Sequence, residues 1–125
     1  GGAELISISG NVTAPDQATS CWIRVTKNGL AFTTNSFSDS ISSVRISRNG
    51  AVTLLDETAA TGIGEPVDFD LSPDEQFMYV TTSSEGGVRA LRVDTETGAL
   101  ESIGTFPGLP SFPQTGVAPA GMVVR

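Results

Sequence analysis

The chain has 125 residues, a formal net charge of −7 at neutral pH, no histidine and one cysteine. Its seven basic residues are scattered, whereas a nucleic-acid surface needs clustered lysine and arginine, so we expect no nucleic-acid partner and attribute the acidity to solubility. A single cysteine without histidine excludes a disulfide framework, and it leaves no metal cluster and no Ser-His-Asp or Cys-His site within the chain. No apolar run approaches the about 18 residues of a membrane span, so we expect no membrane partner.

Short strands separated by turn residues are expected through the first half of the chain. The ranges with apolar alternation or β-branched residues are Gly2–Ser9, Trp22–Val25, Leu30–Thr34, Ser40–Ser47 and Val52–Glu57. Asn28-Gly29 is a residue pair that tight hairpin turns favour. The spacing at Ser42 and Ser43 indicates a bulge or bend, and Cys21 is expected to be buried as a small apolar residue.

The second half contains the clearest strand–turn–strand pattern, from Val67 to Val80. Asp68 and Asp70 alternate there with apolar residues, and the Ser-Pro-Asp-Glu turn at 72–75 leads into a β-branched and aromatic run. The predicted strands are Val67–Leu71, Phe77–Thr82, Val88–Val93, Leu100–Thr105 and Gly121–Val124. Residues 106–115 hold three prolines and are expected to be irregular, and no segment has the apolar period of a helix longer than one turn.

An internal repeat organises these strands. The aligned ranges are 25–29 with 71–75, 30–35 with 77–82, 41–46 with 88–93, and 50–55 with 98–103. At the flanks, Leu5 and Ile8 match the last strand of the unit, and residues 119–124 match its first strand at 66–71. A four-stranded unit that repeats every roughly 40 to 50 residues is typical of β-propeller blades. The sequence therefore predicts an all-β propeller fragment with two four-stranded blades and one orphan strand at each end.

The repeat also sets the expected organisation of the chain. Residues 1–20 form the last strand of a preceding blade and a loop, 21–60 and 61–106 are the two blades, and 107–125 form a loop and the first strand of the closing blade. A propeller needs about four to eight blades to close, so we expect other polypeptide to complete the ring. The remaining blades of a cleaved parent chain are favoured over self-association, because head-to-tail copies would build a hybrid blade without its two middle strands. The Gly-Gly start without an initiator methionine indicates a processed, engineered or fragmentary product.

Two stretches, 25–56 and 71–104, resemble the lactonase-like seven-bladed propeller family. This family includes bacterial 6-phosphogluconolactonases and fungal carboxymuconate-lactonizing cyclases. The resemblance rests on the Ser-Pro-Asp turn, the Tyr-Val-Thr-Thr strand that follows it, and the DTETGAL run at 94–100. It implies that the chain is the C-terminal portion of a seven-bladed ring.

The same resemblance implies a hydrolase or cyclase acting on a small anionic lactone, with no cofactor. Enzymes of the family use His, Arg and Glu around the central channel, and this chain has no His, so its catalytic residues remain unknown and are expected mainly in other blades. The alternative is a non-catalytic propeller that recognises a small ligand or a protein on one ring face. For the compartment, a cytoplasmic and an exported bacterial protein both remain open.

Four residues are candidates for ligand binding at the channel. The repeat places Trp22 and Asp68 at equivalent positions, and it places Arg24 and Asp70 at the next such pair. If these strands are innermost, the indole could stack on a ring and the carboxylate could act as an acid or base or bind a cation. The structural alternative is that Trp22 packs between blades and Asp68 bonds backbone groups. For Arg24 and Asp70, an ion pair between neighbouring blades is favoured over an anion site.

Overall fold

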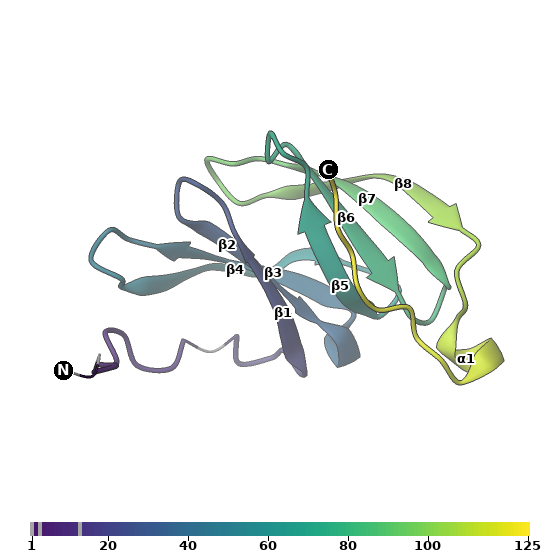
Figure 1. Cartoon of the computed structure of the whole chain (residues 1–125), viewed down its shortest axis with the longest axis horizontal. Coiled ribbons are helices and arrows are strands. Elements are labelled where there is room, and N and C mark those ends of the chain that lie inside the picture. The colour runs from purple at the N-terminus through teal and green to yellow at the C-terminus, as the bar shows by residue number, and fades with distance from the viewer. Residues whose placement is uncertain (1, 3, 13) are drawn as a thin grey trace.

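The computed structural model describes residues 2, 4–12 and 14–125, and it contains two four-stranded antiparallel sheets (Figure 1). The first sheet has the order β1-β2-β3-β4, and its strands are Ser20–Val25, Leu30–Asn35, Ser40–Ile46 and Val52–Thr61. The second has the order β5-β6-β7-β8, and its strands are Pro66–Leu71, Phe77–Thr82, Gly87–Val93 and Leu100–Pro107. Each sheet is thus a meander of neighbouring strands, which confirms the two predicted blades.

Short helical turns complete the described secondary structure. The 3-10 turn η1 spans Ser36–Ser38, and α1 spans Phe112–Thr115 within the segment that was predicted to be irregular. In the described ranges no helix exceeds a turn, as expected, and none is long and apolar enough to cross a membrane.

The strand registers confirm the internal repeat. In the first blade Arg24 lies opposite Phe32, and in the second blade Asp70 lies opposite Tyr79. Both first strands also have a register shift at the same place, between Ser20 and Ile23 and between Pro66 and Phe69. The predicted irregularity at Ser43 is present as register shifts on both sides of that residue. Positions 24 and 70 are therefore structural equivalents.

The core lies between the two sheets. Its buried apolar side chains come from both blades and from the loop that joins them: Leu30, Phe32, Ile41, Ile63, Phe69, Met78, Val80, Leu91 and Val93. Period-2 alternation places one face of each sheet in this interface. Each blade therefore contributes a different one of its two faces to the same core.

The opposite face of each blade has apolar residues that nothing in the described structure buries fully. Phe69 is 0% exposed, but its equivalent in the first blade, Ile23, is 54% exposed. Phe32 is likewise 0% exposed, and its equivalent Tyr79 in the second blade is only half-buried. The two outer faces thus have apolar side chains at the same positions as the buried interface, but no sheet of the described structure covers them.

The ends of the chain and Cys21 differ from the predictions. Gly2–Ser9 and Gly121–Val124 form no strand in their described residues; Ala3 lies outside those residues. A lone strand has no neighbour with which to form a backbone ladder, so extended sequence alone does not produce a strand here. Cys21 is exposed, because it lies at the register shift of an edge strand instead of in the core.

Candidate functional site

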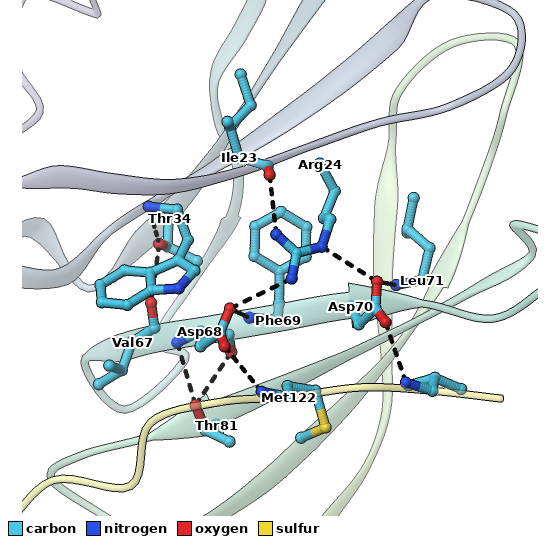
Figure 2. Close-up of polar contacts among 12 residues, drawn as sticks. Ile23, Arg24, Thr34, Val67, Asp68, Phe69, Asp70, Leu71, Thr81 and Met122 are labelled. Carbon is cyan, nitrogen blue, oxygen red and sulfur yellow. Dashed lines mark hydrogen bonds and ion pairs between the residues drawn. The ribbon is translucent and has the colours of Figure 1, made fainter.

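Three extended segments lie side by side at the centre of the molecule: β1, β5 and the C-terminal segment 119–125, which we call the C-terminal strap (Figure 1). The two sheets spread outward from β1 and β5 toward β4 and β8. On β5, Phe69 faces the core between the blades, and alternation turns Asp68 and Asp70 to the opposite face. There the two carboxylates lie between Arg24 and the strap (Figure 2).

Arg24 joins the first strands of the two blades. Its Nε donates to Oδ1 of Asp70 at 3.1 Å, and its Nη2 lies 3.8 Å from Oδ1 of Asp68. Nη1 donates to the carbonyl oxygen of Ile23 at 3.1 Å, and the guanidinium carbon lies 5.9 Å from the centre of the Phe69 ring. The predicted ion pair between neighbouring blades is therefore present, and it includes a second, longer contact to Asp68.

Each carboxylate also connects β5 to the C-terminal strap. Asp68 accepts from the N–H of Phe69 through Oδ1 at 2.8 Å and from the N–H of Met122 through Oδ2 at 2.8 Å (Figure 2). Asp70 repeats the pattern two residues later, with the N–H of Leu71 at 3.0 Å and that of Val124 at 3.0 Å. Side-chain oxygens thus accept backbone N–H groups where a strand ladder would use carbonyl oxygens.

The sequence predictions did not include these contacts to the strap. The partners are 54 positions apart, and the irregular chain between them decides where the strap lies. The one signal was the match of residues 119–124 to 66–71, which indicated that both segments take the same place in successive blades.

Burial and charge decide what the two carboxylates can do. The Asp68 side chain is 5% exposed, that of Asp70 is 22% exposed, and that of Arg24 is 37% exposed. Burial raises the pKa of Asp70, but hydrogen bonds from Val124, Leu71 and Arg24 and the charge of Arg24 together hold that pKa below its usual value. Asp70 therefore stays ionised at neutral pH, and its carboxylate lies against the positive charge of Arg24.

Trp22 lies between the blades. Its side chain packs against the buried core, and its backbone N–H donates to Oγ1 of Thr34 at 3.4 Å. Thr34 in turn donates to the carbonyl oxygen of Val67 at 3.4 Å, so the indole lies where the two blades are tied together. The structure thus brings Arg24, Asp68 and Asp70 into contact and places Trp22 in the packing. A ligand-binding role for the four residues stays a prediction.

The loops that lead into β1 and β5 are held by the turn between β2 and β3. Ser36, in that turn, donates two hydrogen bonds to the residues where β1 and β5 begin. Its N–H donates to the carbonyl oxygen of Thr19 at 3.2 Å, and its hydroxyl donates to the carbonyl oxygen of Pro66 at 2.5 Å. Oδ1 of Asp39 accepts from the N–H of Gly64 at 2.6 Å and of Glu65 at 2.9 Å. The heads of the two inner strands are therefore fixed together at one end of the molecule.

No group of three or more metal-ligating side chains occurs in the described ranges 4–12 and 14–125.

Comparison with known proteins identifies a family. The sequence model of the family described as "Lactonase, 7-bladed beta-propeller" matches residues 4–112. No curated protein matches the chain.

Three solved structures resemble the two blades. A candidate 6-phosphogluconolactonase from Bacteroides uniformis has a TM-score of 0.59 and 23% identity, over 69% of this chain and 26% of that one. Another, from Bacteroides fragilis, has a TM-score of 0.60 and 21% identity, over 72% and 26% of the two chains. A protein of unknown function from Desulfotomaculum acetoxidans has a TM-score of 0.55 and 15% identity, over 70% and 28%. At these identities the likeness shows the fold, and the chain spans about a quarter of each structure.

Proposed function

The chain belongs to the seven-bladed lactonase β-propeller family, and from that premise we propose that it contributes two blades to a ring that hydrolyses or forms a small anionic lactone. The observation that carries the proposal is the family match, which includes both blades and the loop between them. Two structural neighbours described as candidate 6-phosphogluconolactonases support a lactone as the substrate class. A fold by itself supports many activities, so the residues of the inner strands must supply the rest of the argument.

In this ring, β1, β5 and the C-terminal strap form part of the channel wall. Asp68 and Asp70 hold the wall together, because each of their oxygens already accepts a hydrogen bond from the protein. Arg24 is the inner-strand group with exposed surface and free donors, since a guanidinium has five N–H groups and the three contacts above use one each. Its remaining donors are suited to a carboxylate or phosphate of the ligand.

The catalytic groups themselves are proposed to lie in other blades. Proton transfer needs a side chain that can give or take a proton within hydrogen-bond reach of the substrate. The Asp68 carboxylate is buried and bonded to Phe69 and Met122, so it is poorly placed to act as a general base.

The alternative function is a binding propeller without catalysis. One observation favours it: the carboxylates of Asp68 and Asp70 both accept backbone hydrogen bonds that connect β5 to the C-terminal strap, so they have a structural role. Under this alternative, Arg24 and the ring face around it recognise a small anion or an acidic group of a protein.

The partners of the two outer faces are proposed to be further blades of the same ring. Ile23 is equivalent to the buried Phe69, and Tyr79 is equivalent to the buried Phe32, so each outer face has half of an interface that the chain forms internally. A four-stranded sheet with the same apolar positions is the occupant that fits both faces. Self-association of this chain is the other way to cover them.

The test is turnover by the intact protein purified from its natural host, on a panel of lactones that includes 6-phosphogluconolactone. We expect hydrolysis of at least one anionic lactone, and we expect Arg24→Gln to raise the KM of that lactone more than it raises the KM of an uncharged one. Glu101→Gln is the matched control, because Glu101 lies on β8, far from the inner strands. Folded protein that turns over no member of the panel, but binds an anionic ligand through Arg24, would favour the binding propeller instead.

The partner proposal is tested by mass spectrometry of the same sample together with light scattering of the native particle. A ring completed by other blades gives a particle heavier than 12.9 kDa that contains further propeller sequence. A particle made only of 12.9 kDa copies would contradict it and establish self-association.

A further inference from the structure

Two side chains of the first blade hold a single turn of the second blade. The side-chain amide of Asn28, in the turn between β1 and β2, donates to the carbonyl oxygen of Thr95 at 2.7 Å. Nη2 of Arg45, on β3, donates to the carbonyl oxygen of Glu96 at 2.6 Å. Both acceptors lie in the turn between β7 and β8, so these two contacts run from donors of the first blade to acceptors of the second.

The second blade has the equivalent positions on its own outer face. The repeat aligns Asn28 with Asp74 and Arg45 with Arg92. The strand registers confirm the second pair, because each arginine lies opposite the first residue of the second strand of its blade. In the first pair, each Oδ1 accepts from the hydroxyl of the residue two positions earlier, at 2.6 Å and 2.5 Å.

Asp74 changes the chemistry of the outer contact. A carboxylate accepts hydrogen bonds but cannot donate one, whereas the amide of Asn28 donates to a carbonyl oxygen. Hydrogen bonds from Ser72 and Gln76 hold the pKa of Asp74 below its usual value, and the charge of Lys27 also favours the ionised form. Asp74 is therefore negatively charged at neutral pH, and a neighbour of the second blade has to supply a donor at this position.

Arg92 keeps the donor that Arg45 has in the first blade. Its side chain is 62% exposed, and its Nε lies 3.7 Å from Oε2 of Glu101, which is 75% exposed. An exposed pair of this kind contributes little, so it does not hold the guanidinium in place. The outer face of the second blade thus presents one negative and one positive group.

The C-terminal strap shows on which side the neighbour lies. Asp70, the equivalent of Arg24, accepts from the N–H of Val124 at 3.0 Å, so the strap lies against β5 as β5 lies against β1 (Figure 2). The repeat matches the strap to β5. On β7, Arg92 lies between two core residues, and alternation turns its side chain away from the core. Arg92 therefore faces the side on which a third sheet would lie.

We propose that this face binds a further propeller blade whose turn between its third and fourth strands carries a lysine or an arginine. That basic side chain pairs with Asp74, and a carbonyl oxygen of the same turn accepts from Arg92. The inference rests on the proposed ring and specifies the neighbour of its second blade. The first blade has a turn of this kind, since Arg48 lies between β3 and β4 and is exposed. Opposite charges at this contact would favour one neighbouring blade over others.

The first experiment identifies the neighbour by photo-cross-linking in the intact protein from its natural host. A benzophenone amino acid replaces Gln76, which is exposed and lies between Asp74 and Phe77, the residue opposite Arg92. We expect mass spectrometry to find a cross-linked peptide from a further blade, with a lysine or arginine in its turn. A turn without a basic residue, residues 47–50 of a second copy, or no cross-link at all would each overturn the inference.

The second experiment measures the cross-link yield of charge variants at the urea concentration that halves the wild-type yield. Asp74→Asn and Arg92→Ala should each weaken docking about two- to fivefold, as expected for partly exposed polar contacts. Asp94→Asn is the matched control for Asp74, because Asp94 also accepts from N–H groups of its own turn. Arg48→Ala is the control for Arg92, and a loss as large as that of Arg92→Ala would indicate a second copy and overturn the inference.

A charge reversal separates pairing from general stability. Asp74→Lys should lower the yield further, and changing the basic residue of the identified turn to aspartate should restore it in the double variant. A double variant no better than Asp74→Lys alone would overturn the ion pair.

Lactone turnover by the same sample distinguishes this inference from the proposed activity. A cross-linked blade without a basic turn, in a sample that turns over lactones, leaves the proposed function in place and removes the inference. A cross-linked basic turn without turnover of any lactone supports the inference and removes the proposed activity.

Discussion

Nε of Arg24 lies 3.1 Å from Oδ1 of Asp70, and this contact joins the first strands of the two blades. Both side chains are partly exposed, so solvent screens the pair and its net contribution should be small. We predict a coupling free energy of about 0.5–1 kcal/mol between Arg24→Gln and Asp70→Asn in a double-mutant cycle. Chemical denaturation at low and high salt measures it, and the coupling should fall as salt rises. A coupling of zero at low salt would contradict a stabilising ion pair.

Asp70 also gives a prediction for pH. Its pKa is lower in the folded protein than the ordinary value of 3.8, so its carboxylate stabilises the fold above that value. This stabilisation is lost as the pH falls through the folded-state pKa. We therefore expect the difference in unfolding free energy between wild type and Asp70→Asn to be largest near neutral pH and to narrow below pH 3.8.

The comparison of wild type with Asp70→Asn also controls for the other aspartates whose pKa values are lowered. Asp74 and Asp94 also have lowered pKa values, from hydrogen bonds within their own turns, and both are present in the two proteins. Their contributions cancel in the difference. A gap that is constant from pH 7 to pH 2 would show that the carboxylate charge of Asp70 contributes nothing.

The sequence was sufficient to predict the blades because the patterns that indicate strands and turns lie within short stretches of the chain. Alternation, hairpin turns and the repeat fixed eight strands, and the observed ends differ from the predicted ones by a few residues. The ion pair between Arg24 and Asp70 followed from the same repeat, since equivalent positions lie at the same height in adjacent blades.

The features that the sequence did not predict correctly depend mostly on contacts between residues far apart in the chain. The segments 2–9 and 121–124 were predicted as strands, but a strand needs a ladder partner, and the sequence supplies none within these two blades. The binding of Met122 by Asp68 required the path of a loop whose prolines gave no regular signal. The positive φ of Glu65 could not be predicted either, because glycine is the residue whose presence in a sequence indicates that backbone conformation.

Gly29 and Glu75 occupy equivalent turn positions, and they predict opposite tolerance to substitution. At Gly29 φ is 82°, and an added Cβ would lie 2.4 Å from the carbonyl oxygen of Ile46. We expect Gly29→Ala to cost about 1–3 kcal/mol of unfolding free energy. Glu75→Gly relieves a φ of 62° but loses the contact to Lys27, so its change should stay within about 0.5 kcal/mol of zero. Thermal unfolding of both variants checks the contrast, and equal losses would contradict it.

Ile23 tests whether another blade covers the first sheet. Its equivalent, Phe69, is fully buried, and Phe69→Ala should cost about 3–5 kcal/mol in any context. If a preceding blade covers Ile23 in the intact protein, Ile23→Ala should cost about 2–4 kcal/mol; if the face is open, the cost should be below about 0.5 kcal/mol. Phe37, which is 82% exposed on η1, provides the control for an uncovered apolar residue. Denaturation of the intact protein distinguishes the two outcomes, and a small loss at Ile23 would contradict the proposed neighbour.

Asp68 predicts how firmly the C-terminal strap is held. Its carboxylate accepts from the N–H groups of Phe69 and Met122, both at 2.8 Å, and its side chain is 5% exposed. Asp68→Ala leaves both donors without that acceptor, so we expect a loss of about 1–3 kcal/mol and faster amide hydrogen exchange at Met122. Asp68→Asn keeps one acceptor oxygen and should lose less. Exchange at Val124 should change little in either variant, because Asp70 still accepts from that N–H at 3.0 Å. Equal acceleration at both amides would mean that the strap opens as one unit, and unchanged exchange at Met122 would show that Asp68 does not hold it.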